Sequence, residues 1–67
     1  MLPTISVVIA THNSSRTIGR CLASIRSQRY PQDRIEIIIA DGASTDETKK
    51  IASGYNVRWI AVDPSRQ

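Results

Sequence analysis

Short apolar runs alternate with amphipathic segments along this chain. Two runs, ISVVIA at residues 5–10 and IEIIIA at residues 35–40, are nearly continuous and rich in β-branched residues. This pattern is typical of strands that are covered on both faces in a parallel sheet. A third run, VRWIAV at residues 57–62, predicts another strand, closed by Asp63-Pro64. The chain therefore predicts three buried strands.

A helix is predicted between the first two strands. Its apolar positions recur at helical spacing and would form one face: Ile18, Leu22 and Ile25. Three polar side chains before it could cap its start: Asn13, Ser14 or Ser15. Tyr30-Pro31 should end it, because the residue before proline is pushed out of the helical region.

A second helix is predicted after the second strand. Ser44 and Glu47 have the S-x-x-E spacing of a capping box. Its apolar face would consist of residues at helical spacing: Thr48, Ile51, Ala52 and Tyr55. Gly54 or Asn56 could stop the helix by taking the left-handed conformation. The predicted element order is therefore β-α-β-α-β.

Right-handed crossovers between parallel strands arrange these elements as an α/β, half-Rossmann-like unit with the spatial strand order 3-2-1. The first strand is then an edge strand. Its sequence is too apolar to face water, and such an edge invites pairing with more chain. We therefore expect the remaining strands of the sheet to come from downstream chain or from an oligomer partner.

The length and composition limit the remaining possibilities. With 67 residues the chain forms at most one small domain. Cys21 is the only cysteine and His12 the only histidine, so neither an internal disulfide nor a Cys/His metal site can be built. The apolar runs are too short for a membrane helix, and Met1-Leu2-Pro3 lacks the features of a signal peptide. We expect a cytoplasmic protein, and membrane association of the complete protein stays open.

The charge pattern argues against nucleic acid as a partner. The net charge is +3, but the arginines are scattered and aromatic residues make up 4% of the chain. Nucleic-acid sites usually need a basic stripe with interleaved aromatics. The glycine fingerprints of dinucleotide and P-loop sites are also absent from the sequence, which disfavours an NAD-type oxidoreductase.

Polar residues follow the first two predicted strands at the point where each strand ends. Thr11-His12-Asn13 follows the first, and Asp41-Gly42-Ala43-Ser44 follows the second. Ligands of open parallel sheets bind beyond the carboxyl ends of the strands, so these two loops should form one site. Asp41 could accept a hydrogen bond from a sugar hydroxyl or a base N–H, although Asp is also a common turn residue. The start of the second helix should favour phosphate or another anion.

Several neighbouring residues have simpler structural interpretations. His12 could be a general base, but a hydrogen-bonding or packing role is favoured for a lone histidine. Asn13 could cap the helix or hold the loop by side-chain hydrogen bonds, and capping is favoured. Ser44 is interpreted as a cap rather than a nucleophile, and Asp46 suits the positive end of the second helix. Two further residues are expected in the core: Cys21 and Trp59.

Three segments in this order resemble the amino-terminal part of a family 2 glycosyltransferase with the GT-A fold. They are ISVVIATHN at 5–13, CLASI at 21–25 with Gln28 and Tyr30-Pro31, and EIIIADGASTDET at 36–48. The sequence departs from many relatives at two positions. A second Asp is common where Gly42 stands, and a Gly is common where Ala43 stands.

The resemblance implies a nucleotide-sugar donor, most often a UDP-sugar. It places Thr11, His12 and Asn13 against the nucleoside and gives Asp41 a hydrogen bond to the base. Residues 1–67 would be the amino-terminal nucleotide-sugar-binding part of a single, truncated glycosyltransferase domain. The family's metal-binding Asp-x-Asp segment and its catalytic base have no counterpart here, so the ligands of Mg²⁺ or Mn²⁺ are expected outside this chain.

The sequence thus supports one leading function and one alternative. By resemblance, the complete enzyme would transfer a sugar, with inversion, to a hydroxyl of a sugar or lipid-linked acceptor, and this fragment alone would be inactive. The alternative is a non-catalytic nucleotide-binding or interaction module that uses the same two loops.

Overall fold

The computed structural model describes residues 2–63. In chain order these contain β1 (Ile5–Thr11), α1 (Ile18–Arg26), η1 (Gln32–Arg34), β2 (Ile35–Asp41), α2 (Thr48–Ala52), η2 (Ser53–Tyr55) and β3 (Arg58–Ala61). The two η segments are single turns of 3-10 helix that precede β2 and β3. The predicted β-α-β-α-β order is confirmed, while Pro64 of the predicted third-strand end lies outside the described residues.

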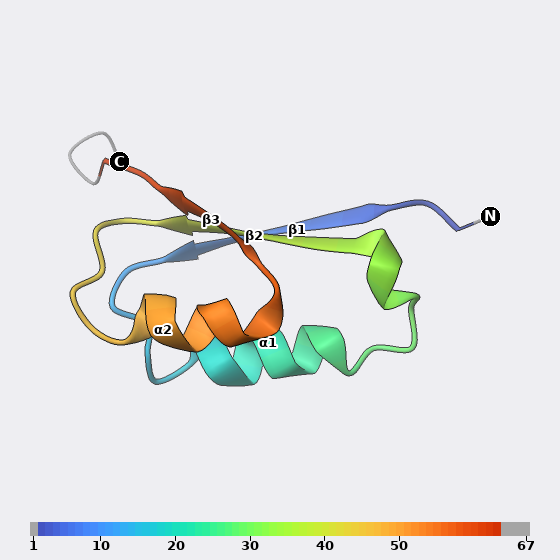
Figure 1. Cartoon of the computed structure of the whole chain (residues 1–67), viewed down its shortest axis with the longest axis horizontal. Helices are drawn as coiled ribbons and strands as arrows, with labels where there is room; N and C mark the ends of the chain where they lie inside the picture. Colours follow the sequence, from blue (N-terminus) through green and yellow to red (C-terminus); the bar gives the residue numbers. More distant parts are fainter. Residues whose placement is uncertain (1, 64–67) are drawn as a thin grey trace.

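The three strands form one parallel sheet with the order β1-β2-β3, as predicted. β1 pairs with β2 along its whole length, from Ile5 opposite Ile35 to Thr11 opposite Asp41. β3 joins later, and its first residue lies opposite Ile38. The carboxyl ends of all three strands therefore lie at the same edge of the sheet (Figure 1).

Both helices cover one face of the sheet (Figure 1). Five residues, from the helices and from β2, form the buried core: Ile18, Leu22, Ile37, Ile39 and Ala52. Full burial of such an isoleucine or leucine contributes about 1.5–3 kcal/mol. Trp59, which the sequence predicted in the core, is partly buried and packs against these residues. Lys49 lies over its ring, 5.9 Å from the centroid.

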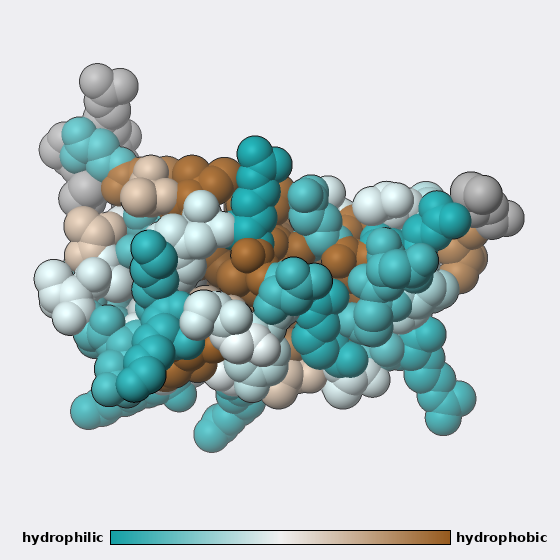
Figure 2. Space-filling view, in the orientation of Figure 1, coloured by the Kyte–Doolittle hydropathy of each residue, from teal (hydrophilic) through white to brown (hydrophobic). Residues whose placement is uncertain are grey.

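The opposite face of the sheet is not covered by any element of residues 2–63. Val8 is 66% exposed and Ile60 is 40% exposed. In Figure 2 hydrophobic side chains gather along the sheet, whereas hydrophilic side chains predominate on the helix layer. The apolar runs predict strands that are covered on both faces. Within the described part of the chain, only one face of the sheet is covered.

The start and end of α1 differ from the prediction. No side chain caps α1, so the predicted cap by Asn13, Ser14 or Ser15 is wrong. The backbone carbonyl of Ser14 instead accepts the N–H groups of Thr17 and Ile18. The polar side chains are engaged elsewhere, as described below. The helix also ends at Arg26, before Tyr30-Pro31, because the chain turns from Ser27 onward.

The start of α2 also differs. The predicted capping box is wrong, because Ser44 lies before the helix and Glu47 makes no capping bond at its start. The predicted stop is confirmed at Asn56, which has φ 52° directly after η2. Cys21 is exposed on α1 rather than buried, since it lies off the face that contacts the sheet.

The end of α1 is tied to the segment that leads into β3. The Arg26 guanidinium donates hydrogen bonds to the backbone carbonyls of Tyr55 and Asn56, at 3.2 and 2.9 Å, and to the side chain of Gln32 at 3.2 Å. This contact lies at the end of the fold away from the carboxyl edge. None of the helices within residues 2–63 is long and apolar enough to span a membrane.

Candidate functional site

Two loops at the carboxyl edge of the sheet form a single hydrogen-bonded unit. We call residues 11–15 and 41–48 the loop pair. The first segment follows β1 and the second follows β2, and side-chain hydrogen bonds connect them repeatedly across about thirty positions of sequence. The structure therefore brings Thr11, His12, Asn13 and Asp41 together, as the sequence predicts.

Asp41 is the buried acid of the loop pair. It continues the row of Ile37 and Ile39 on the helix-facing side of β2 and is only 3% exposed. Its Oδ1 accepts hydrogen bonds from the Thr11 hydroxyl at 2.6 Å and the Ser44 hydroxyl at 2.5 Å. Its Oδ2 accepts the backbone N–H of Ser44 at 2.8 Å. The carboxylate is thus held in one orientation by three donors.

These donors keep Asp41 ionised. Burial on its own raises the pKa of a carboxyl group, because it disfavours the charged form. Here the hydrogen bonds from Ser44 and Thr11, with the nearby charge of His12, outweigh burial and hold the pKa of Asp41 below its ordinary value. A buried anionic acceptor is therefore present at the carboxyl edge of the sheet.

Thr11 and His12 connect the end of β1 to the start of the second loop. Thr11 is 6% exposed, and its backbone carbonyl accepts the N–H of Gly42 at 2.9 Å. His12 Nδ1 lies 2.5 Å from the carbonyl oxygen of Gly42. Because a carbonyl oxygen only accepts hydrogen bonds, Nδ1 must carry the proton. In the neutral ring, Nε2 of this exposed side chain is then an acceptor.

Asn13 binds the second loop rather than capping α1. Its Oδ1 accepts the backbone N–H of Thr45 at 2.8 Å, and its own N–H donates to the Ser44 hydroxyl at 2.8 Å. Its φ is 49°, in the left-handed region that Asn tolerates better than most residues. Asn13 therefore turns the first loop toward the second.

Asp46 forms the second connection of the loop pair. Its carboxylate accepts the N–H of Ser15 at 3.2 Å, the N–H of Thr48 at 3.0 Å and the Thr48 hydroxyl. Hydrogen bonds from Thr48 and Ser15 lower the pKa of Asp46 to about 2, and the bond from the Thr48 hydroxyl contributes the most. Thr48 is fully buried, and its hydroxyl also accepts the N–H of Ser14 at 2.8 Å. Asp46 thus occupies the start of α2, where the sequence suggested a bound anion.

The sequence did not predict the connecting role of three residues: Ser15, Thr45 and Thr48. Their partners lie on the other loop, so no local spacing marks them. The one available signal is the density of hydroxyl and carboxyl side chains in STDET, which exceeds what one helix start requires.

The described residues do not provide a metal site. Between positions 2 and 63, no three His, Cys, Asp or Glu side chains are grouped so that they could hold an ion. Asp41 and Asp46 are each committed to hydroxyl and N–H donors of the loop pair. This donor set does not fit Mg²⁺ or Mn²⁺.

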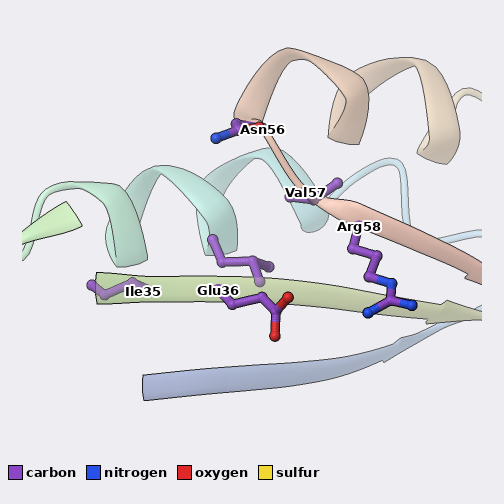
Figure 3. A pocket seen from close by; sticks show the side chains of 6 residues that line it. Ile35, Glu36, Asn56, Val57 and Arg58 are labelled. Atoms are coloured by element: carbon purple, nitrogen blue, oxygen red, sulfur yellow. The ribbon is translucent and has the colours of Figure 1, made fainter. Parts of the chain in front are cut away.

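A hollow of about 310 Å³ lies elsewhere, near the amino end of β2 (Figure 3). It is lined by Ile35, Glu36, Ile37, Asn56, Val57 and Arg58. It exists because β3 joins the sheet only opposite Ile38. Since ligands of open parallel sheets bind at the carboxyl ends, the loop pair is the stronger candidate.

Comparison with known proteins identifies consistent relatives. The sequence profile described as glycosyl transferase family 2 matches residues 6–63. Glycosyltransferase AglE of Haloferax volcanii is 36% identical over 58 residues, which cover 87% of this chain and 19% of AglE. The dolichyl N-acetyl-alpha-D-glucosaminyl phosphate 3-beta-D-2,3-diacetamido-2,3-dideoxy-beta-D-glucuronosyltransferase of Methanococcus voltae is 46% identical over 62 residues, again with 87% of this chain and 19% of the relative covered.

A solved structure is also similar. The mannosyltransferase PcManGT from Pyrobaculum calidifontis, in complex with GDP-Man and Mn²⁺, matches with a TM-score of 0.75 and 28% identity. The match covers 94% of this chain and 20% of that one. The chain therefore spans about a fifth of the length of these relatives.

Proposed function

Because the chain belongs to glycosyl transferase family 2, we propose that it forms the nucleotide-binding half of an enzyme that transfers a sugar from a nucleotide-diphosphate sugar to an acceptor hydroxyl. Its parallel β-α-β-α-β unit matches a GT-A glycosyltransferase. Residues 1–67 are proposed to be the amino-terminal part of that single domain.

The observation that carries this proposal is the buried, ionised Asp41 at the carboxyl edge of the sheet. Hydrogen bonds from Thr11 and Ser44 fix its orientation and keep it charged. An anionic acceptor with fixed geometry suits a base N–H donor, since hydrogen bonds with one ionised partner are stronger than neutral ones. Thr11, His12 and Asn13 are proposed to contact the nucleoside beside it.

We propose uridine diphosphate as the donor nucleotide. The resemblance of residues 5–48 to the family supports it, and so does the single buried carboxylate that Asp41 offers to a base N–H. The solved relative was crystallised with GDP-Man, so guanosine is the competing base that an experiment must separate from uridine.

The catalytic part of the proposed enzyme lies outside residues 2–63. Inversion by direct displacement needs a carboxylate base at the acceptor. Asp41 and Asp46 are held by hydroxyl and N–H donors of the loop pair, and the resemblance to the family implies that the base belongs to a later segment. Mg²⁺ or Mn²⁺ is proposed for the complete enzyme, with ligands from other residues. This half alone is then expected to be inactive.

The acceptor and the location are further proposals. The Methanococcus voltae relative is named for a dolichyl-linked phosphate sugar, which supports a lipid-linked acceptor. Another relative, TarS of Staphylococcus aureus, is named for poly(ribitol-phosphate), which supports a sugar-type polymer. We propose a cytoplasmic enzyme, because its nucleotide-sugar donor would be available there.

Calorimetric titration of the naturally expressed protein tests the nucleotide site. UDP should bind more tightly than ADP, and Asp41→Asn should weaken UDP binding about tenfold or more, because the amide removes the charge and adds a donor. Equal affinities for UDP and ADP would contradict the proposal.

A matched control separates this effect from a general change of charge. Asp33→Asn makes the same chemical change at an exposed position on η1, away from the loop pair. It should leave UDP binding unchanged. If both substitutions weakened binding equally, Asp41 would have no special role.

A further inference from the structure

We propose that Thr11 and Ser44 are specificity-determining residues that restrict Asp41 to one free acceptor position, which selects a base with a single N–H donor, uracil, over guanine. The inference rests on the proposed function, because it concerns the nucleotide bound at the same loop pair. It assigns the choice of base to two hydroxyl groups that themselves bind the carboxylate.

Most acceptor positions of the Asp41 carboxylate are already occupied within the loop pair. An ionised carboxylate has about four lone-pair positions, two on each oxygen. Oδ1 accepts two hydroxyl groups, from Thr11 at 2.6 Å and Ser44 at 2.5 Å. Oδ2 accepts one backbone N–H, from Ser44 at 2.8 Å. About one position therefore remains, and it lies on Oδ2.

The two candidate bases differ in what they offer a carboxylate. Uracil has one N–H, placed between two carbonyl groups. Guanine has a ring N–H beside an exocyclic amino group, and this pair of donors fits both oxygens of one carboxylate. Such a bidentate contact requires a free position on each oxygen. Because Oδ1 of Asp41 is filled, the loop pair can satisfy the uracil donor but leaves one guanine donor unpaired.

The hydroxyl groups are held firmly enough to enforce this choice. Thr11 is 6% exposed and lies opposite Asp41 in the sheet register, and its carbonyl accepts the Gly42 N–H. The Ser44 hydroxyl also accepts the N–H of Asn13 at 2.8 Å. Moving either hydroxyl away would leave a buried polar group without its partner, which is costly.

The first experiment uses the unaltered protein in its naturally expressed form. Calorimetry with UDP, GDP and UDP methylated at N3 should show UDP binding at least about tenfold more tightly than either competitor. Methylation removes the single donor without changing the rest of the nucleotide. Equal binding of UDP and its N3-methyl form would overturn the inference.

The second experiment removes the hydroxyl donors from Oδ1 of Asp41. Thr11→Val and Ser44→Ala each remove one hydroxyl donor, so each should lower the preference for UDP over GDP by about tenfold. Thr11→Ser keeps the hydroxyl and should restore the preference. Ser53→Ala is the matched control, since it removes an exposed hydroxyl that bonds only the Lys50 carbonyl on the far side of α2.

The outcomes separate the two proposals. If UDP binds but the UDP-to-GDP ratio is unchanged in Thr11→Val and Ser44→Ala, the hydroxyl inference fails and the proposed function stands. A preference of the unaltered protein for GDP would overturn both the hydroxyl inference and the choice of UDP as donor, while the proposal of a nucleotide-sugar-binding half would stand. If no nucleoside diphosphate binds, both proposals fail. Should a variant not fold, the N3-methyl comparison in the unaltered protein still decides.

Discussion

The two ends of one buried row on β2 are stabilised by different means. Ile37 and Ile39 are 1% and 0% exposed and pack against the helices. Asp41, two residues further along the same face, is 3% exposed and is surrounded by hydrogen-bond donors. Apolar side chains need only close packing when they are buried, whereas a carboxylate needs donors in place of water. One row therefore contains both the core of the fold and the acid of the candidate site.

The comparison shows why the loop pair has so many hydroxyl groups. Each donor that Asp41 requires must itself be held, so Ser44 is bound by Asn13, and Asn13 in turn binds Thr45. Asp46 repeats the arrangement with Ser15 and Thr48. This connected network fixes the positions of the side chains at the carboxyl edge, while the core supplies most of the stability.

The largest expected effect is at the apolar end of the row. Ile39→Ala removes buried methyl groups from a side chain with no exposed surface. It should lower the free energy of unfolding by about 2–5 kcal/mol, because a cavity adds to the lost burial. Urea unfolding followed by circular dichroism measures this loss.

A graded variant and a binding measurement sharpen the result. Ile39→Val removes less volume and should cost only about 0.5–1.5 kcal/mol. The folded fraction of each variant should keep the nucleotide affinity of the unaltered protein, because Ile39 does not belong to the loop pair. A loss of affinity that follows the loss of stability would show that core and site are not separable.

A smaller effect is expected from Asp46, and it depends on pH. The pKa of Asp46 is about 2 in the folded protein, against an ordinary value of 3.8. At pH values between these two pKa values, Asp46 binds more protons in the unfolded chain than in the folded protein. The free energy of unfolding therefore rises with pH across this range. The contribution is complete above about pH 4 and is lost as the pH falls toward 2.

Asp46→Asn tests that dependence. The variant cannot ionise at this position, so its unfolding midpoint in urea should fall less steeply between pH 4 and pH 2 than that of the unaltered protein. Asp33→Asn, an exposed substitution of the same kind on η1, should keep the original slope. Identical acid dependence in all three proteins would mean that the loop-pair bonds of Asp46 contribute no stability.

The same contrast explains what the sequence could predict. The element order, the parallel sheet and the 3-2-1 strand order follow from apolar periodicity and chain handedness, which are local or general properties. Ile37, Ile39 and Asp41 could all be placed on this basis. The same topology predicts that four residues meet at one edge of the sheet: Thr11, His12, Asn13 and Asp41.

The failed predictions concern polar side chains with two available partners. Ser44 and Glu47 have capping-box spacing, and Asn13 precedes a helix, so local bonds were the natural expectation. The structure pairs Ser44 with Asp41 and Asn13 with Thr45 instead. Spacing along the chain cannot reveal a partner about thirty residues away, and that is where most bonds of the loop pair are made.

The smallest expected effects come from two left-handed residues of the loop pair. Ala43 has φ 55° and an exposed side chain, and Asn13 has φ 49°. Glycine adopts this conformation without strain, whereas alanine incurs a cost of about 1–2 kcal/mol. Ala43→Gly should therefore raise the free energy of unfolding by up to about 0.5 kcal/mol, after the greater entropy of the unfolded glycine chain is subtracted.

Asn13→Gly makes the same backbone change but should have the opposite sign. Asn tolerates the left-handed region, so little strain is relieved. The variant also loses the Oδ1 acceptor of the Thr45 N–H, worth about 1 kcal/mol. Urea unfolding of both variants side by side measures the difference. If both glycines stabilised the protein equally, backbone strain alone would govern these positions, and the side-chain network could not be what holds the first loop to the second.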